Sequence, residues 1–179
     1  MAREIRGELE LGPLAPLDPR VLADHLGIPI IPLSDMLTDA PAVAHLLTKE
    51  QEVFSAVTVF CGNRRTIVHN DAHASVRQNS NLAHELAHGL LHHPPTPALD
   101  NKGCREWNQD IEDEAQWLAG ALLVTEDAAQ AIARAGMPLV AAARRFQVSE
   151  PMIQFRLNVT GARRRVQRAR NAWSRTTRP

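Results

Sequence analysis

The five residues from His84 to His88 read His-Glu-Leu-Ala-His, a spacing that can hold a metal ion. On a helix the two histidines lie one turn apart on the same face, so both imidazoles can reach one ion about 2.0 Å from each nitrogen. Glu85 lies beside them, where its carboxylate can take a proton from a water molecule whose pKa a metal lowers. The motif therefore predicts metal ligands at His84 and His88 and a general base at Glu85.

A catalytic zinc site needs a third protein ligand, because one of its four positions stays open for water and substrate. Three carboxylates are candidates, 24 to 26 residues after the second histidine: Glu112, Asp113 and Glu114. Glu112 is favoured because it shares a helical face with Ala115 and Ala119, whose small side chains would let two helices approach closely. Glu114 is the alternative ligand. In a competing interpretation, these acids only complement the positive N-terminal end of a helix.

Two long helices are predicted to carry these residues. From His73 onward, apolar residues recur at helical spacing until Pro94, where a helix must end. A second helix is predicted from about Glu106 to Val124. A shorter helix is expected over residues 18–26, and another over residues 125–136, capped by a threonine and ended by a glycine.

A β-hairpin is predicted upstream of the histidines. Residues 53–60 are rich in β-branched side chains, residues 66–69 resume the pattern, and Cys61, Gly62 and Asn63 supply the turn between them. Residues 28–33 are apolar but interrupted by two prolines, which favours an edge strand. Helices together with these few strands predict an α+β fold.

The C-terminal part has a different character. Residues 138–160 predict two short helices joined by a tight turn, similar to a helix-turn-helix with Gln154, Arg156 and Asn158 on its second helix. The tail after Gly161 is rich in arginine and is predicted to be a frayed helix or disordered. If this part bound DNA, the second helix would enter a major groove and the tail would contact phosphate. The favoured alternative is packing, repressor docking or contact with the acidic part of the chain.

The zero net charge of the 179 residues conceals an asymmetry. Residues 1–133 hold nine Lys and Arg against 19 Asp and Glu, whereas residues 134–179 hold 11 Arg and one acid, Glu150. Formal charges of about −10 and +10 follow, an acidic body with a basic end. A basic segment of this kind is typical of contacts with phosphates or with acidic protein surfaces.

Composition excludes several classes of protein. With 44% hydrophobic and 22% charged residues, the chain is neither disordered nor collagen-like. Its longest uncharged apolar run, residues 117–124, is far shorter than a membrane span, and the N-terminal ten residues are too charged for a signal peptide. Cys61 and Cys104 lack metal-site spacing. We therefore expect a cytoplasmic protein with two reduced thiols and no membrane partner.

Three segments together resemble the ImmA/IrrE family of zinc metallo-endopeptidases: NDAHASVRQNSNLAHELAHGLLHH, EDEAQWLAGALL and RFQVSEPMIQFRL. The resemblance covers roughly residues 18–160. It implies a minimal zincin, with an active-site helix on a small antiparallel sheet. Carried over by position, His84, His88 and Glu112 would bind one Zn²⁺ and Glu85 would be the catalytic base. Members cleave a transcriptional repressor and so switch on mobile-element transfer or a stress response.

Peptide hydrolysis also needs a donor for the oxyanion that forms on the attacked carbonyl group. The chain has no tyrosine, so the candidates are zinc itself or one of four side chains: His73, Arg77, His92 and His93. Among these side chains His92 is taken as the catalytic donor because it would lie one turn beyond His88 on the same face; the equal alternative is a solvent-facing or loop-anchoring histidine. Gln116 occupies the place where the family often has Asn or Asp, and it is expected to orient a ligating histidine.

These observations predict a zinc endopeptidase that cleaves a helix-turn-helix repressor. A peptidase domain is expected over residues 1–137, a helix-turn-helix-like extension over 138–160 and an arginine-rich tail over 161–179. The alternative is a non-catalytic regulator, stapled by zinc, that binds a repressor or DNA through residues 138–179. Glu85 discriminates between them, because a structural zinc site has no use for a base at that position. A zinc hydrolase acting on a small amide is a weaker alternative. The sequence leaves the oligomeric state open.

Overall fold

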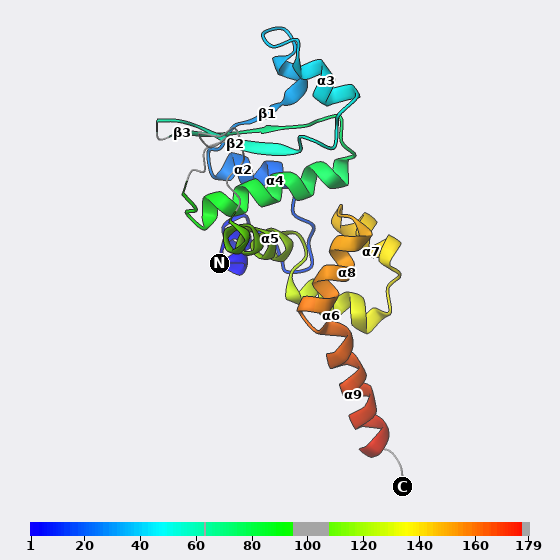
Figure 1. Ribbon diagram of the computed structural model, residues 1–179. Coiled ribbons are helices and arrows are strands. Elements are labelled where there is room, and N and C mark those ends of the chain that lie inside the picture. The colour runs from blue at the N-terminus through cyan, green and yellow to red at the C-terminus, as the bar shows by residue number, and fades with distance from the viewer. Residues whose placement is uncertain (63, 95–107, 177–179) are drawn as a thin grey trace. The chain divides into compact units, whose positions relative to one another are not determined.

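The structure, a computed structural model, describes residues 1–62, 64–94 and 108–176 (Figure 1). Two compact units divide the chain: residues 18–119 form one, and residues 1–17 with 120–179 form the other. The predicted functional division at residues 137 and 160 stays a prediction. Part of the predicted loop, including Cys104, and the predicted start of the second long helix at Glu106 lie outside the described residues.

A three-stranded sheet with the order β1-β3-β2 forms the first unit's centre. The predicted hairpin is confirmed: β2 (Ala56–Cys61) and β3 (Arg64–His69) pair in antiparallel register. The predicted edge strand β1 (Ile30–Pro32) is present too, but it runs parallel to β3, so the sheet is mixed and not wholly antiparallel. Among the described residues β1 is an edge strand, where a proline is tolerated because its missing N–H is not needed to pair with another strand.

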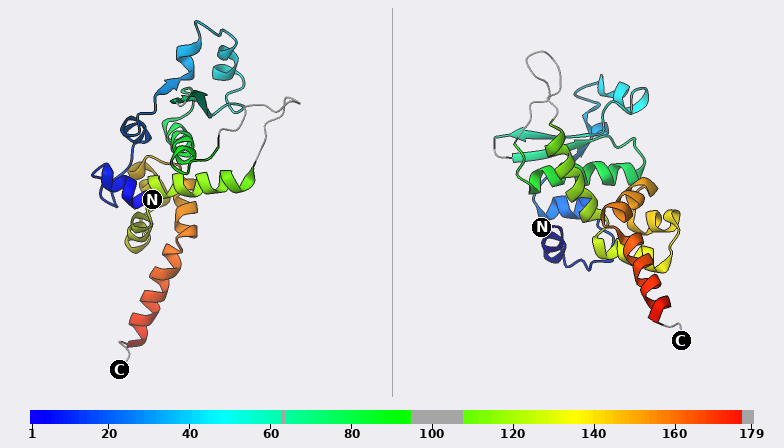
Figure 2. Two further views of the ribbon diagram at one scale, coloured as in Figure 1. Left: turned by 90° about the vertical axis from the view of Figure 1, so that its left-hand side faces the viewer. Right: turned by 60° about the horizontal axis from the view of Figure 1, so that its bottom comes forward.

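Helix α4 (Ser75–Leu90) lies along one face of the sheet, next to α2 (Pro19–His25); both views of Figure 2 show this layer. Asp18 caps α2 by accepting a hydrogen bond from the backbone of Arg20. Four side chains of α4 are fully buried: Leu82, Ala83, Leu86 and Ala87. They form the apolar stripe that fixes the rotation of the helix, which leaves the motif's histidines and glutamate only half-buried on its other side.

The other face of the sheet carries η1 (Leu33–Met36) and α3 (Val43–Thr48). Asn70, fully buried at the end of β3, donates its side-chain amide to the carbonyls of Leu46 and Phe54. This amide ties the segment between α3 and β2 to the sheet, and so fixes where the hairpin begins.

The second unit is helical: its elements are α1 (Ala2–Glu8), the end of α5 (Gln109–Leu123), α6 (Glu126–Ala135), α7 (Leu139–Phe146), α8 (Glu150–Val159) and α9 (Ala162–Thr176). The predicted cap and stop of α6 are confirmed: Thr125 Oγ1 accepts from Ala128 N at 2.9 Å, and Gly136 ends the helix at φ +60°. The predicted pair of short helices is α7 and α8, and its inner residues Val148 and Ile153 are buried. None of the described helices is long and apolar enough to cross a membrane.

Two buried arginines bind the C-terminal end of α5. Arg6 donates to the carbonyl of Leu122 and Arg156 Nε to that of Val124, both at 2.8 Å. Positive charge at this position complements the negative end of a helix. Arg156 is only 4% exposed, so it packs inside the unit and does not face solvent, where the weaker alternative of a major-groove contact would have needed it. The apolar period of α8 turns this arginine toward α5, and the carbonyl that it binds cannot be identified from sequence.

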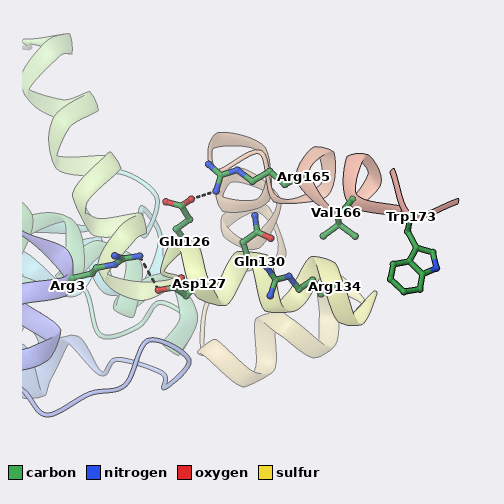
Figure 3. A pocket seen from close by; sticks show the side chains of 9 residues that line it. Arg3, Glu126, Asp127, Gln130, Arg134, Arg165, Val166 and Trp173 are labelled. Carbon is green, nitrogen blue, oxygen red and sulfur yellow. Dashed lines mark hydrogen bonds and ion pairs between the residues drawn. The ribbon is translucent and has the colours of Figure 1, made fainter. Parts of the chain in front are cut away.

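The arginine-rich tail is helical through Thr176, and α9 packs against α6. A groove of about 860 Å³ runs between these helices, with Gln130, Val166 and Trp173 among its lining residues (Figure 3). At its edge, Arg165 forms an ion pair with Glu126.

Candidate metal centre

Three predicted ligands come together in the first unit. His84 and His88 project from successive turns of α4, and their Nε2 atoms lie 3.0 Å apart. Glu112, from the first turn of α5, places Oε2 3.0 Å from His84 Nε2 and 3.7 Å from His88 Nε2. Two ligands from one helix and one from a second helix are thus directed at a common point.

The spacing of these atoms fits a tetrahedral metal ion. Ligands about 2.0 Å from a zinc ion are about 3.3 Å from each other, and the three observed separations bracket that value. Burial, and then the neighbouring His84, lower the pKa of His88 to about 4. Its imidazole is therefore neutral at neutral pH, the form that binds a metal. Two imidazole nitrogens and one carboxylate oxygen are the ligand type of catalytic zinc sites.

The start of α5 determines which acid reaches the histidines. Asn108 Oδ1 accepts hydrogen bonds from the backbone N–H groups of Asp110 and Ile111, which begins the helix and puts Glu112 in its first turn. Ala115 and Ala119 are buried, as the shared-face argument expected. Glu112 thus has both properties considered from sequence, because it lies near a helix N-terminus and also faces the histidines.

Glu85 is held by a residue that the sequence analysis did not identify. Thr58, in the middle of β2, donates its hydroxyl hydrogen to Glu85 Oε2 at 2.6 Å. This hydrogen bond to a carboxylate is short and charge-assisted, so it fixes one oxygen and leaves Oε1 for another proton. Only the packing of the hairpin against α4 brings the two side chains together. In the sequence, the one sign that Thr58 could have such a role was its position as a polar residue within an otherwise apolar strand.

His92 does not continue the face of His88, so that prediction is wrong. Helix α4 ends at Leu90, and His92 has a left-handed backbone at φ +56° and an exposed side chain. The N–H groups of His92 and His93 bond to the carbonyls of Gly89 and His88, at 3.2 and 3.0 Å. This is the hydrogen-bond pattern of a Schellman helix end, which reverses the chain. The side chain of His92 instead borders a hollow lined by Arg64 and Arg65.

His93 takes the place beside His88 that was expected for His92. Its Nδ1 lies 2.9 Å from His88 Nδ1, and its Nε2 lies 3.2 Å from Glu114 Oε2. The His93 side chain is 8% exposed, whereas that of Glu114 is 67% exposed. Glu114, the alternative ligand, therefore contacts a neighbour of the metal ligands and not the ligand cluster itself.

The remaining candidates lie elsewhere. His73 is buried and its Nε2 is 2.8 Å from the carbonyl of Gln51, while Arg77 pairs with Glu52. Asp113 and Gln116 are exposed, and among the described residues no hydrogen bond joins Gln116 to either ligating histidine. Of three further histidines, His25 and His45 are exposed and His69 is buried.

Comparison with known proteins agrees with the ligand geometry. The model of the Peptidase_M78 family, described as the IrrE N-terminal-like domain, matches residues 23–158. This range contains the sheet, α4, α5, α7 and α8 up to Asn158. No curated protein and no solved structure gives a significant match. Because the match extends over well more than half of the chain, the protein belongs to the family of the IrrE N-terminal-like domain, a peptidase family.

Proposed function

We propose that the protein is a single-zinc endopeptidase that cleaves a helix-turn-helix transcriptional repressor in the cytoplasm, and so releases mobile-element or stress-response genes from repression. The observation that carries the proposal is the convergence of His84, His88 and Glu112 beside a carboxylate fixed by hydrogen bonding. The family match supports peptide hydrolysis as the reaction class. Zinc is the ion that fits two imidazoles and one carboxylate best among common catalytic metals.

When bound, zinc would lower the pKa of a water molecule and polarise the scissile carbonyl group. Glu85 would act as general base, taking the proton at Oε1 while Thr58 holds Oε2. The protonated carboxyl would then pass this proton to the nitrogen of the leaving amine, which balances the hydrolysis. The sequence has no tyrosine that could stabilise the oxyanion, so the bound metal would supply that stabilisation.

The substrate would bind as an extended strand along β2. In the sheet order β1-β3-β2 one edge of β2 faces no other strand among the described residues. An extended peptide can add to such an edge through backbone hydrogen bonds. The peptide would then pass close to the hydroxyl of Thr58 and to the carboxylate of Glu85. Both groups lie there because α4, which carries Glu85, packs against β2.

A basic helical unit supports a regulatory protein as the substrate. Arg163, Arg164 and Arg168 on α9 are exposed, and among the described residues none of them forms an ion pair. The α7–α8 pair resembles a helix-turn-helix, but its buried Arg156 cannot reach phosphate. We therefore favour repressor docking over direct DNA reading for this part of the chain, with a contact to DNA backbone through α9 as the weaker proposal.

Mapping of new protein N-termini in cells of the source organism would test this proposal. Cells lacking the protein would be complemented with the wild type, with Glu85→Gln, or with the surface variant Glu50→Gln as a matched control. We expect cleavage within a helix-turn-helix protein with the wild type and the control, and none with Glu85→Gln. If all three strains show the same N-termini but the wild type and Glu85→Gln alter transcription equally, the non-catalytic regulator is the correct function.

A further inference from the structure

We propose that His93 and Glu114 form a hydrogen-bonded chain behind His88 that orients this histidine for metal binding, so that both act as positioning residues. The inference rests on the proposed zinc site and adds two residues that do not themselves ligate. The chain runs from His88 Nδ1 to His93 Nδ1 at 2.9 Å, and from His93 Nε2 to Glu114 Oε2 at 3.2 Å.

The direction of these hydrogen bonds follows from the metal site. His88 directs Nε2 at His84 and Glu112, so a metal bound there leaves its hydrogen on Nδ1. Among the described residues its hydrogen-bond partner is His93 Nδ1, which must then be the acceptor. His93 carries its own hydrogen on Nε2 and donates it to the Glu114 carboxylate. Each nitrogen and the carboxylate oxygen is thus either a donor or an acceptor, and every donor in the hydrogen-bonded chain meets an acceptor.

The protein backbone places His93 in this position. The Schellman end of α4 reverses the chain at His92, and the His93 N–H binds the carbonyl of His88 itself. The same two residues are therefore joined by a backbone bond and by a side-chain bond. Glu114 comes from α5, two residues after Glu112, so α5 contributes one proposed ligand and one support. Helix α4 contributes His84 and His88, and the segment just after it contributes His93.

Such outer partners matter because they fix the ring orientation and tautomer of a ligating histidine. Metal ligands of this type usually donate to a carboxylate, a backbone carbonyl or water. Here a second imidazole stands between the ligand and the carboxylate, and it is nine-tenths buried while the carboxylate is mostly exposed. The chain therefore connects the metal site to a charge at the surface of the unit.

Zinc affinity of the full-length protein, measured by competition with a chromophoric chelator, tests this inference. We expect His93→Phe to raise the zinc Kd by about 10- to 100-fold, and Glu114→Gln to raise it by a smaller factor. Because the two act in series, the double variant should bind zinc no more weakly than His93→Phe alone. His93→Gln, which keeps an acceptor, should recover part of the affinity and provides a second variant if the phenylalanine disturbs folding.

The protein offers a matched control in the exposed pair His45 and Glu50, whose Nε2 and Oε1 atoms are 3.3 Å apart. His45→Phe and Glu50→Gln should leave zinc affinity within about two-fold of the wild type. The absorption bands of bound Co²⁺ should shift in the His93 variants and not in these controls, since they report ligand geometry.

Unchanged zinc affinity and Co²⁺ spectra in His93→Phe, with the wild type binding one zinc, would overturn this inference and leave the proposed peptidase intact. A wild type that binds no zinc would overturn both. Additive losses in the double variant would show that the two residues do not act as one chain.

Discussion

Replacement of Glu112 by glutamine tests the metal centre most directly. The substitution keeps the size of the side chain in the first turn of α5, but removes the carboxylate that lies 3.0 and 3.7 Å from the two Nε2 atoms. An amide oxygen is not among the usual ligands of zinc. Loss of an outer hydrogen-bond partner alone costs about 10- to 100-fold in affinity, so we expect this ligand to cost at least about 100-fold.

Thermal unfolding converts that loss into a measurable shift. At a zinc concentration 100 times the wild-type Kd, binding stabilises the folded state by about 2.7 kcal/mol, and a 100-fold weaker site retains about 0.4 kcal/mol. For a chain of this length each kcal/mol corresponds to about 2–4 °C. Zinc should therefore raise the Tm of the wild type by about 5–11 °C and that of Glu112→Gln by only about 1 °C.

The neighbouring carboxylate provides the control for this experiment. Asp113 is exposed and accepts a hydrogen bond from Gln109, so Asp113→Asn should keep the full zinc-induced shift. Metal content of the dialysed proteins should be about one zinc per chain in the wild type and the control, and close to none in Glu112→Gln. A glutamine variant that retains both the zinc and the shift would refute the assignment of Glu112 as third ligand.

Four further outcomes are expected. Thr58→Val should lower kcat by about 10-fold, because it removes a charge-assisted hydrogen bond to the proposed general base. Its zinc affinity should be unchanged, and Thr58→Ser, which keeps the hydroxyl, should remain active. His92→Gly should retain activity and raise the free energy of unfolding by about 1 kcal/mol in urea titrations, since glycine relieves the left-handed backbone; a loss of kcat would restore a catalytic role. Arg156→Ala should lower the free energy of unfolding by about 2 kcal/mol, against less than about 0.5 for exposed Arg144→Ala, because it leaves a buried carbonyl unpaired. Burial, and then Arg20, lower the pKa of His69 below 6.5, so the metal-free protein should lose stability as pH falls through 6.5, and His69→Gln should reduce that slope.

Local patterns in the sequence predicted most of the elements. The apolar stripe of α4, the β-branched strands of the hairpin, and the threonine cap and glycine stop of α6 all depend on residues close together in the chain. Helical spacing within five residues is enough to put His84 and His88 on one face, which is why their proximity could be predicted without a structure.

Helix ends were the weakest point of the sequence reasoning. A single residue in the left-handed conformation, His92, ends the face of α4 and brings His93 against His88 in its place. Helical extrapolation cannot foresee this reversal, because a non-glycine residue rarely adopts that backbone conformation. The parallel pairing of β1 was missed for a related reason, since strand direction is set by the path of the whole connection.

The sequence by itself therefore determined that His84 and His88 share one helix face, the α+β character and the family of the protein, and it is the source of the prediction that Glu85 is the general base. Tertiary structure alone decided that Glu112 and not Glu114 contacts His84 and His88, that Thr58 binds the carboxylate of Glu85, and that Arg156 is buried. The physical reason is sequence separation. Spacing within one helix fixes side chains a turn apart, whereas contacts between α4, α5 and the hairpin depend on how apolar faces pack, which no local pattern encodes.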